Sequence, residues 1–278
     1  MGFIDDMFQP NDVLRNKQVR AELAKKHTEE MDNKYKEEIN LCVQNTIIYS
    51  ELEDNFHMPQ EVAAGKQPGA FDYILEDLDS VSAAYKYFEK GKKLTILNFA
   101  SFRTPGGLFM NGSSAQEECL CHESFFYNVL RKFKPNYYNI NELYLNDHLY
   151  KNCSLYSSNI IFERNDKAIT CDVLTCAAPN KNSAQKYAGV TDEHNFDMLK
   201  SRIHFLLEVA AEQKVDTLIL GAFGCGVFKQ NPAEVAAIFM TELLYDFHDC
   251  FKKVVFAIPD RESVNYKEFS KVFVPMLG

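Results

Sequence analysis

No apolar stretch of this 278-residue chain approaches the eighteen or so residues that a membrane-spanning helix needs. The first residues are acidic and lack the apolar core of a secretory signal, so no export signal is expected. Basic residues are also in short supply, because 30 lysines and arginines stand against 39 aspartates and glutamates, a formal net charge of −9. Such a charge disfavours general binding to nucleic-acid backbones. We therefore expect no membrane attachment and no direct binding of nucleic acid.

Eight cysteines are too few, in a chain of this length, for a disulfide-dense scaffold. Several stand in apolar runs, where cysteine behaves as a small core residue. Free thiols and a reducing, cytoplasmic compartment are therefore expected. A separate expectation is that the protein is a monomer. Apolar residues make up 46% of the chain, which is enough for a substantial core in one large domain, or in one domain with a small appendage.

The order of the predicted elements indicates a layered α/β domain. A charged segment at about 11–38 has an incomplete apolar stripe and is expected to form an N-terminal helical appendage with a solvated outer face. Strands are predicted at 41–49, 94–100, 159–164, 168–176, 217–222 and 254–259, and helices at 80–90, 115–133, 195–213 and 232–247. Strands that alternate with helices are typical of such a domain, and its binding site is expected at the carboxyl ends of the strands.

The segment 98–127 carries the richest set of polar and glycine residues. A predicted strand ends there, and the motifs PGG (105–107) and NG (111–112) follow it. Their glycines allow a backbone path that is closed to other residues, and they let a ligand approach the main chain closely. The motif QEE (116–118) then opens a predicted helix. The segment therefore offers a flexible loop beside two carboxylates.

A structural interpretation of this segment competes with a catalytic one. Residues 114–117 fit a capping box, in which the hydroxyl of Ser114 binds the amide of Glu117 while the glutamate side chain reaches back. The helix dipole also favours acidic residues in a first turn. Capping explains Glu117 better than it explains Glu118, and glycines alone usually mark only a turn.

A second glycine-rich loop joins a predicted strand to a predicted helix in 217–232 (TLILGAFGCGVFKQNP). Loops of this kind commonly hold phosphates, although this one would serve equally well as a plain connection. Its order G-x-x-G-x-G differs from the dinucleotide-binding fingerprint, and the loop has no Walker lysine. A third segment, 174–180 (LTCAAPN), indicates a turn at a strand end. Together, two such glycine loops would grip a diphosphate with backbone N–H groups, and the acidic pair would address a sugar linkage.

Taken in order, these motifs resemble the microbial-type poly(ADP-ribose) glycohydrolases, a branch of the macrodomain superfamily. That family carries a triple-glycine loop followed, after a short spacer, by Gln-Glu-Glu, and here Gly106-Gly107-Leu108 is followed by QEE. NFA before the loop, NG within it, LC-x-x-S after the acidic pair, TCAAPN and GAFGCGVF match as well, so the resemblance spans most of the chain. Two positions depart: Leu108 replaces the third glycine, and Ser101 stands where the family often has a ribose-contacting asparagine.

The resemblance implies a three-layer α/β/α macrodomain-like fold with a mixed sheet over 41–278, preceded by an N-terminal helical accessory region at 1–40. It implies a glycosidase that hydrolyses ribose–ribose O-glycosidic bonds of poly(ADP-ribose), with ADP-ribose or the polymer on modified proteins as partner and with no cofactor or metal. Glu118 would act as the catalytic carboxylate, first as an acid and then as a base toward water, while Glu117 would hold ribose hydroxyls. The substrate-binding residues would be Ser101, Gly106, Gly107, Asn111, Gln116, Asn180, Gly224, Cys225, Gly226, Val227 and Phe228.

Other functions stay open at this stage. The changes at Ser101 and Leu108 would suit a non-catalytic ADP-ribose reader that binds without turnover. A hydrolase of another ADP-ribosyl linkage, or of a free metabolite that contains ADP-ribose, would share the same motifs. The intact QEE motif favours a hydrolase. Phe228 fits a core position as well as a ligand contact, and Cys119 and Cys121 diverge on a helix and make a poor zinc pair.

Overall fold

A mixed seven-stranded sheet forms the centre of the computed structural model, which describes residues 16–52, 57–59, 69 and 71–273. The strand order is β1-β4-β5-β3-β6-β7-β2. β1 pairs antiparallel with β4 and β4 antiparallel with β5, and the remaining neighbours are parallel. The strands are β1 Ile47–Ser50, β2 Tyr73–Glu76, β3 Leu94–Phe99, β4 Cys153–Arg164, β5 Lys167–Cys176, β6 Thr217–Leu220 and β7 Lys253–Ala257.

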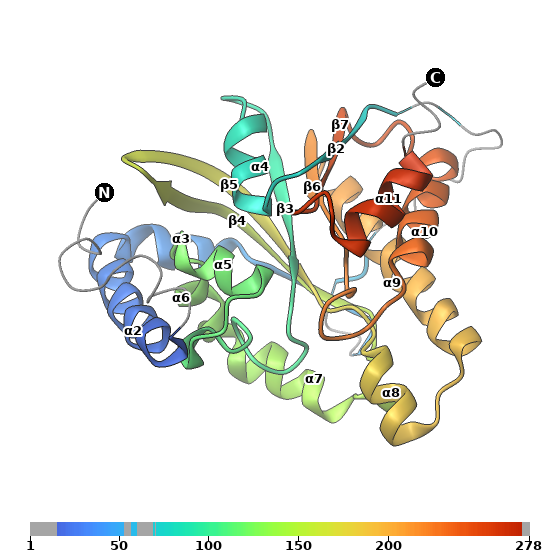
Figure 1. Ribbon diagram of the computed structural model, residues 1–278. Helices are drawn as coiled ribbons and strands as arrows, with labels where there is room; N and C mark the ends of the chain where they lie inside the picture. Colours follow the sequence, from blue (N-terminus) through green and yellow to red (C-terminus); the bar gives the residue numbers. More distant parts are fainter. Residues whose placement is uncertain (1–15, 53–56, 60–68, 70, 274–278) are drawn as a thin grey trace.

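Helices cover both faces of this sheet, and a separate apolar core lies under each layer (Figure 1). One layer consists of α2 Lys17–Lys34, α3 Lys36–Asn45, α4 Ser80–Tyr87, α5 Gln116–His122 and α6 Phe126–Leu130. The other consists of α9 Asp192–Glu212, α10 Pro232–Tyr245 and α11 Val264–Phe273. Two short helices, α7 Asn139–Leu143 and α8 Lys181–Ala188, lie in the connections before β4 and after β5. The predicted three-layer α/β/α architecture is confirmed.

The central strands form because their residues are apolar in continuous runs. A strand with helices on both faces buries every side chain, which removes the alternation seen in half-exposed strands. All four residues of β6 are buried, and β3 is buried up to Asn98. Because β3, β5, β6 and β7 run parallel, their carboxyl ends meet at one edge of the sheet. The two glycine-rich loops follow β3 and β6, and they therefore emerge at that same edge.

The N-terminal helix α2 holds the first glycine loop from outside. A Cβ atom on Gly112 would lie 1.9 Å from the carbonyl oxygen of Lys17, so the loop and the helix backbone touch at this point. Arg20 Nε donates to the Gly112 carbonyl at 2.7 Å. Further along α2, Asp32 accepts from Arg131 and from Asn128 Nδ2, the latter at 2.8 Å. These contacts fasten α2 to the loop and to α6.

Two predicted elements are wrong in their type or extent. The predicted strand at 41–49 is mostly helix, because α3 continues to Asn45 and only β1 is extended. Ile39 and Cys42 bury one helical face while Leu41 is 56% exposed, so the short apolar run belongs to a helix. The predicted helix at 115–133 breaks after α5, where the hydroxyl of Ser124 accepts from Phe126 N at 3.1 Å.

The predicted N-terminal helix at 11–38 is interrupted as well. It divides at Tyr35 into α2 and α3, and its positions 11–15 lie outside the described residues. Within the described part of the chain, none of the helices combines the length and the apolar character that a bilayer crossing requires.

Candidate active site

A cavity of about 400 Å³ lies at the carboxyl ends of the parallel strands. Its walls come from the start of α4, the first turns of α5 and the loops that follow β5, β6 and β7. Five of the predicted substrate-binding residues line it, namely Gln116, Gly224, Gly226, Val227 and Phe228. The position agrees with the rule that ligands of α/β sheets bind beyond the carboxyl ends of the strands.

The first glycine loop lies directly against the two carboxylates. Gly106 and Gly107 have φ angles of +67° and +58°, a region that favours glycine. A Cβ atom on Gly107 would lie 2.6 Å from Glu118 Oε1 and 2.9 Å from Glu117 Oε2. Only a residue without a side chain fits this contact. The position of the two carboxylates therefore depends on a glycine at position 107.

Glu118 has one satisfied oxygen and one unsatisfied oxygen. Its side chain is buried, with 5% of the residue exposed. Oε1 accepts a hydrogen bond from Leu108 N at 2.9 Å, whereas Oε2 has no partner within the described part of the chain. Buried carboxylate oxygens are almost always hydrogen-bonded, so an unpartnered one is notable. The hydrogen-bonding capacity of this oxygen is therefore unused within the described part of the chain.

Glu117 faces inward and is held by two donors. Its Oε1 accepts from Asn98 Nδ2 at 3.2 Å, and its Oε2 accepts from Ser101 N at 2.8 Å. Burial raises the pKa of Glu117 to about 8, against the opposing effect of these hydrogen bonds. The predicted capping box is therefore wrong: Ala115 is the N-cap residue, and no side chain caps α5.

Gln116 fixes the start of α5 to the sheet. Its Oε1 accepts from Phe99 N at 2.9 Å, and its Nε2 donates to the Leu97 carbonyl at 2.9 Å and to Ser80 Oγ at 3.1 Å. The side-chain amide thus ties α5 to β3 and to α4. Because Gln116 also lines the cavity, it sets the position of one cavity wall relative to the acidic pair.

The second glycine loop presents free backbone donors to the cavity. Gly224 has a φ angle of +74°, and a Cβ atom there would lie 2.7 Å from Ala178 Cβ, so this loop touches the turn that follows β5. The N–H groups of Gly226, Val227 and Phe228 donate to no acceptor in the described part of the chain. Val227 is 77% exposed. Consecutive free N–H groups of this kind suit an anion.

Several predicted site residues do not line the cavity. Glu117 and Glu118 lie beside it, under the first glycine loop, and Ser101 uses its N–H on Glu117 and its hydroxyl to accept from Thr104 N at 3.2 Å. Asn111 is exposed at the end of a single 3-10 turn, and Asn180 caps α8 by accepting from Ser183 N at 3.0 Å. Cys225 is half-buried, and burial raises the pKa of its thiol to about 12.

One wall of the cavity is formed by residues that the sequence motifs did not predict. Asp79 and Ser80, at the start of α4, and Ser263 and Asn265, near the start of α11, also line the cavity. Asp79 accepts from Val81 N and Ser82 N, both at 2.9 Å. The missed signal was β2: it runs parallel to β7, so the residues that follow it must reach the same edge of the sheet.

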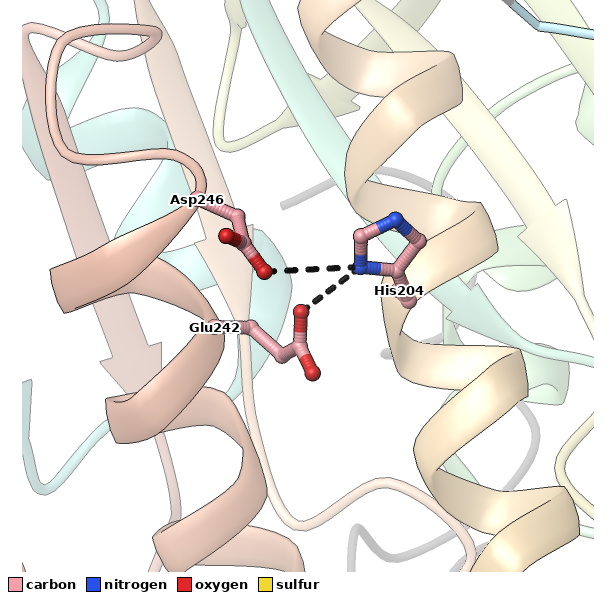
Figure 2. A group of neighbouring side chains, drawn as sticks. All are labelled: His204, Glu242 and Asp246. Carbon is pink, nitrogen blue, oxygen red and sulfur yellow. Dashed lines mark hydrogen bonds and ion pairs between the residues drawn. The ribbon is translucent and has the colours of Figure 1, made fainter. Parts of the chain in front are cut away.

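A separate cluster of possible metal ligands lies between α9 and α10 (Figure 2). His204 Nδ1 lies 2.7 Å from Glu242 Oε2 and 3.9 Å from Asp246 Oδ2, and His204 Nε2 lies 3.4 Å from Glu208 Oε1. Hydrogen bonds from the imidazole to Glu208 and Glu242 raise the pKa of His204 to about 10. We interpret the group as an ion cluster around a protonated histidine. None of its members lines the cavity.

This cluster should make stability depend on alkaline pH. The pKa of His204 is about 10 in the folded chain and about 6.5 when unfolded, so its contribution is full below pH 6.5 and is lost as the pH rises through 10. Because the side chain is 36% exposed, solvent screening reduces the expected contribution to about 2 kcal/mol. Denaturant unfolding should show that His204→Gln is less stable than wild type by this amount at pH 7. The difference in unfolding free energy between the two proteins should disappear by pH 11.

His194→Gln is the matched control for that experiment, because His194 lies on the same helix and is exposed. The control should follow wild type at every pH. A gap for His204→Gln that stays constant from pH 7 to pH 11 would contradict the assignment of a protonated histidine.

Comparison with known proteins agrees with this geometry. A family model described as microbial-type PARG, catalytic domain, matches residues 17–165, more than half of the chain. The structure is similar to a poly(ADP-ribose) glycohydrolase (PARG) from Thermomonospora curvata, with 27% identity and a TM-score of 0.79 over 92% of this chain and all of that one. It is also similar to a Deinococcus radiodurans PARG in complex with ADP-ribose, with 27% identity and a TM-score of 0.73 over 86% of this chain and 98% of that one.

A third similar structure is the Thermomonospora curvata enzyme bound to the inhibitor ADP-HPD, with 27% identity and a TM-score of 0.78 over 92% of this chain and all of that one. No curated protein matches the sequence. These similarities confirm the predicted macrodomain-like fold. The matched region includes α2, the first glycine loop and both glutamates of the acidic pair. The chain therefore belongs to the microbial-type poly(ADP-ribose) glycohydrolase family.

Proposed function

We propose that this protein hydrolyses ribose–ribose O-glycosidic bonds of poly(ADP-ribose) and releases ADP-ribose, with Glu118 as the catalytic carboxylate. The observation that carries the proposal is the state of that side chain. It is buried at the cavity edge, with Oε1 held by Leu108 N and Oε2 without a partner in the described part of the chain. A structural carboxylate would have both oxygens satisfied.

The cavity suits a ligand that carries a diphosphate. Its volume of about 400 Å³ is within the range of small-molecule sites. None of the described residues that line it is a lysine or an arginine, and the N–H groups of the second glycine loop offer consecutive uncharged donors to the phosphates. Backbone donors bind phosphate without a basic surface, which is consistent with the acidic chain.

The chemistry follows from the position of Glu118. It delivers a proton to the departing ribose oxygen while the anomeric carbon gains oxocarbenium character, and the resulting carboxylate then removes a proton from the attacking water. A single carboxylate performs both transfers. Glu117 holds ribose hydroxyls, since its carboxyl group keeps hydrogen-bonding capacity beyond the bonds that it accepts from Asn98 and Ser101. No step uses a cofactor or a metal.

Incubation of the protein with poly(ADP-ribose), followed by chromatography of the products, tests this function. Release of ADP-ribose would support the proposal. Binding of the polymer without release would select the non-catalytic reader, in which Leu108 and Ser101 abolish turnover. Release from a mono-ADP-ribosylated protein, with intact polymer left over, would select a hydrolase of another ADP-ribosyl linkage.

The pKa of Glu117 predicts how ligand affinity depends on pH. With a pKa of about 8, Glu117 is neutral at pH 7 and gains a charge as the pH rises through 8. A new negative charge near the diphosphate should weaken ADP-ribose binding about tenfold between pH 7 and pH 9.5. Calorimetric titration at several pH values measures the effect. Glu117→Gln should bind with a nearly constant affinity, and an equally steep pH dependence in this variant would exclude Glu117 as the group responsible.

The partners and surroundings of the protein are proposed on the same basis. Its ligands are ADP-ribose and poly(ADP-ribose) on modified proteins, and it acts as a monomer in the cytoplasm. Its net charge of −9 disfavours direct binding of nucleic acid, and no membrane attachment is proposed. All eight cysteines are free thiols, which suits a reducing compartment. Residues 1–40 form an accessory region to the catalytic domain 41–278, in which α2 supports the first glycine loop through Gly112.

A further inference from the structure

Arg202, on α9, is a fully buried cation that forms no ion pair with any described residue. Its exposed fraction is 0%. Nε donates to Asn152 Oδ1 at 2.7 Å, Nη1 donates to the carbonyl of Ala177, and Nη2 has no partner in the described part of the chain. Both acceptors are neutral. The described residues therefore supply no counter-charge to the guanidinium group.

Such an arrangement is costly for a folded protein. A buried charge loses its hydration, and proteins normally balance that loss with an ion pair or with a complete set of hydrogen bonds. Arg202 has neither, since it lacks a carboxylate and leaves one of its nitrogens unpaired. A counter-charge that arrives with a ligand would complete the site.

The position of Arg202 indicates which ligand group would supply that charge. Ala177, whose carbonyl it binds, precedes Ala178, which lines the cavity and touches the second glycine loop at Gly224. The guanidinium thus contacts the residue that directly precedes the lining residue Ala178 in the turn after β5. On the cavity side of this wall, the described lining residues provide no cation, whereas the proposed ligand carries a diphosphate.

We infer that Arg202 is a positioning residue of the ADP-ribose site, and this inference rests on the proposed function. Through Ala177 and Asn152 it holds the end of β5 and the start of β4, which fixes the wall against the second glycine loop. Its buried charge attracts the diphosphate across that wall, where the low effective dielectric leaves the interaction little screened. The ligand provides the negative charge that the protein omits.

The test separates the charge of Arg202 from its hydrogen bonds. Arg202→Met and Arg202→Gln remove the charge, the glutamine variant keeps a donor, and Arg202→Lys keeps the charge. Calorimetry gives the affinity of each for ADP-ribose and for adenosine, which lacks the diphosphate. The affinity for ADP-ribose divided by the affinity for adenosine should fall about tenfold in both neutral variants. In the lysine variant this ratio should fall by less than about threefold.

Arg261→Met is the matched control. Arg261 precedes the wall residues Ser263 and Asn265, but its side chain is 71% exposed, so salt screens its charge. Its affinity ratio should stay within about twofold of wild type at physiological salt. Arg202→Gln should turn over the polymer with a raised KM and a nearly unchanged kcat. This pattern is expected because the lost interaction stabilises the bound substrate and the transition state equally.

Three results would overturn the inference: an unchanged ratio in the neutral variants, an equal fall in the lysine variant, or failure of both neutral variants to fold. The last two would assign Arg202 a purely structural role. Failure of wild-type protein to bind ADP-ribose would instead overturn the proposed function, so the two proposals fail separately.

Discussion

Glu118→Gln should abolish release of ADP-ribose from the polymer while leaving ADP-ribose binding intact. The variant keeps the size of the side chain and an oxygen that can accept from Leu108 N, which holds Glu118 Oε1 at 2.9 Å in the native protein. It loses the group that gives and takes the proton. Proton transfer by a positioned side chain contributes about a hundred- to ten-thousandfold, so turnover should fall by at least about a hundredfold. Product chromatography and calorimetry measure the two effects.

Glu193→Gln is the matched control, because Glu193 also stands in the first turn of a helix but is exposed on α9. It should match wild type in both assays, which excludes a general effect of removing a first-turn carboxylate. Thermal unfolding of Glu118→Gln should stay close to that of wild type, since the burial and the Leu108 contact are retained. Normal turnover by a well-folded Glu118→Gln would transfer the catalytic role to Glu117.

The parallel centre of the sheet could be predicted because its signal is local. A strand that is buried on both faces is a short apolar run, and β3, β6 and β7 are runs of this kind that end in glycine or proline motifs. Once the strands are assigned, parallel pairing places the loops after β3 and β6 at one edge. The location of the cavity therefore followed from the sequence pattern.

The orientation of Glu117 could not be predicted because its partners are distant in the sequence. Capping depends on residues within one helical turn, and Ser114 to Glu117 satisfies that local pattern. The inward position depends instead on Asn98 and Ser101, which lie 19 and 16 residues earlier in the chain. A local motif cannot report that β3 and the loop that follows it each deliver a donor to this point. The family resemblance rests on several motifs in order, and it predicted a role for Glu117 in the site where the local spacing predicted a helix cap.

Two further elements escaped prediction for related reasons. β2 is a four-residue strand that pairs with β7, its partner from the far end of the chain, so no neighbouring pattern marks it. Its absence from the prediction hid the wall at Asp79 and Ser80. The pairing of Arg202 with Asn152 and Ala177 likewise arises only when α9 packs against the sheet. Burial of a charged residue is a tertiary property that its sequence position does not reveal.

Gly107→Ala should reduce turnover about as strongly as loss of the carboxylate itself. Its added Cβ would lie 2.6 Å from Glu118 Oε1 and 2.9 Å from Glu117 Oε2, closer than such atoms approach, so the carboxylates must shift. The shift would lengthen the bonds from Leu108 N and Ser101 N that hold them. Misplacement of a reacting group by about 1 Å can cost about a hundredfold in rate. Steady-state turnover of the polymer measures this loss.

Gly189→Ala separates this clash from backbone strain. Gly189 has a φ angle of +65°, close to the +58° of Gly107, but a Cβ atom there would meet nothing within 4 Å. Both variants should lose about 1 kcal/mol of stability from the left-handed backbone, and Gly107→Ala should lose more because its Cβ also displaces the carboxylates. Only Gly107→Ala should lose turnover. Equal activity in the two variants would mean that the acidic pair tolerates displacement, and the close contact between loop and carboxylates would then have no catalytic role.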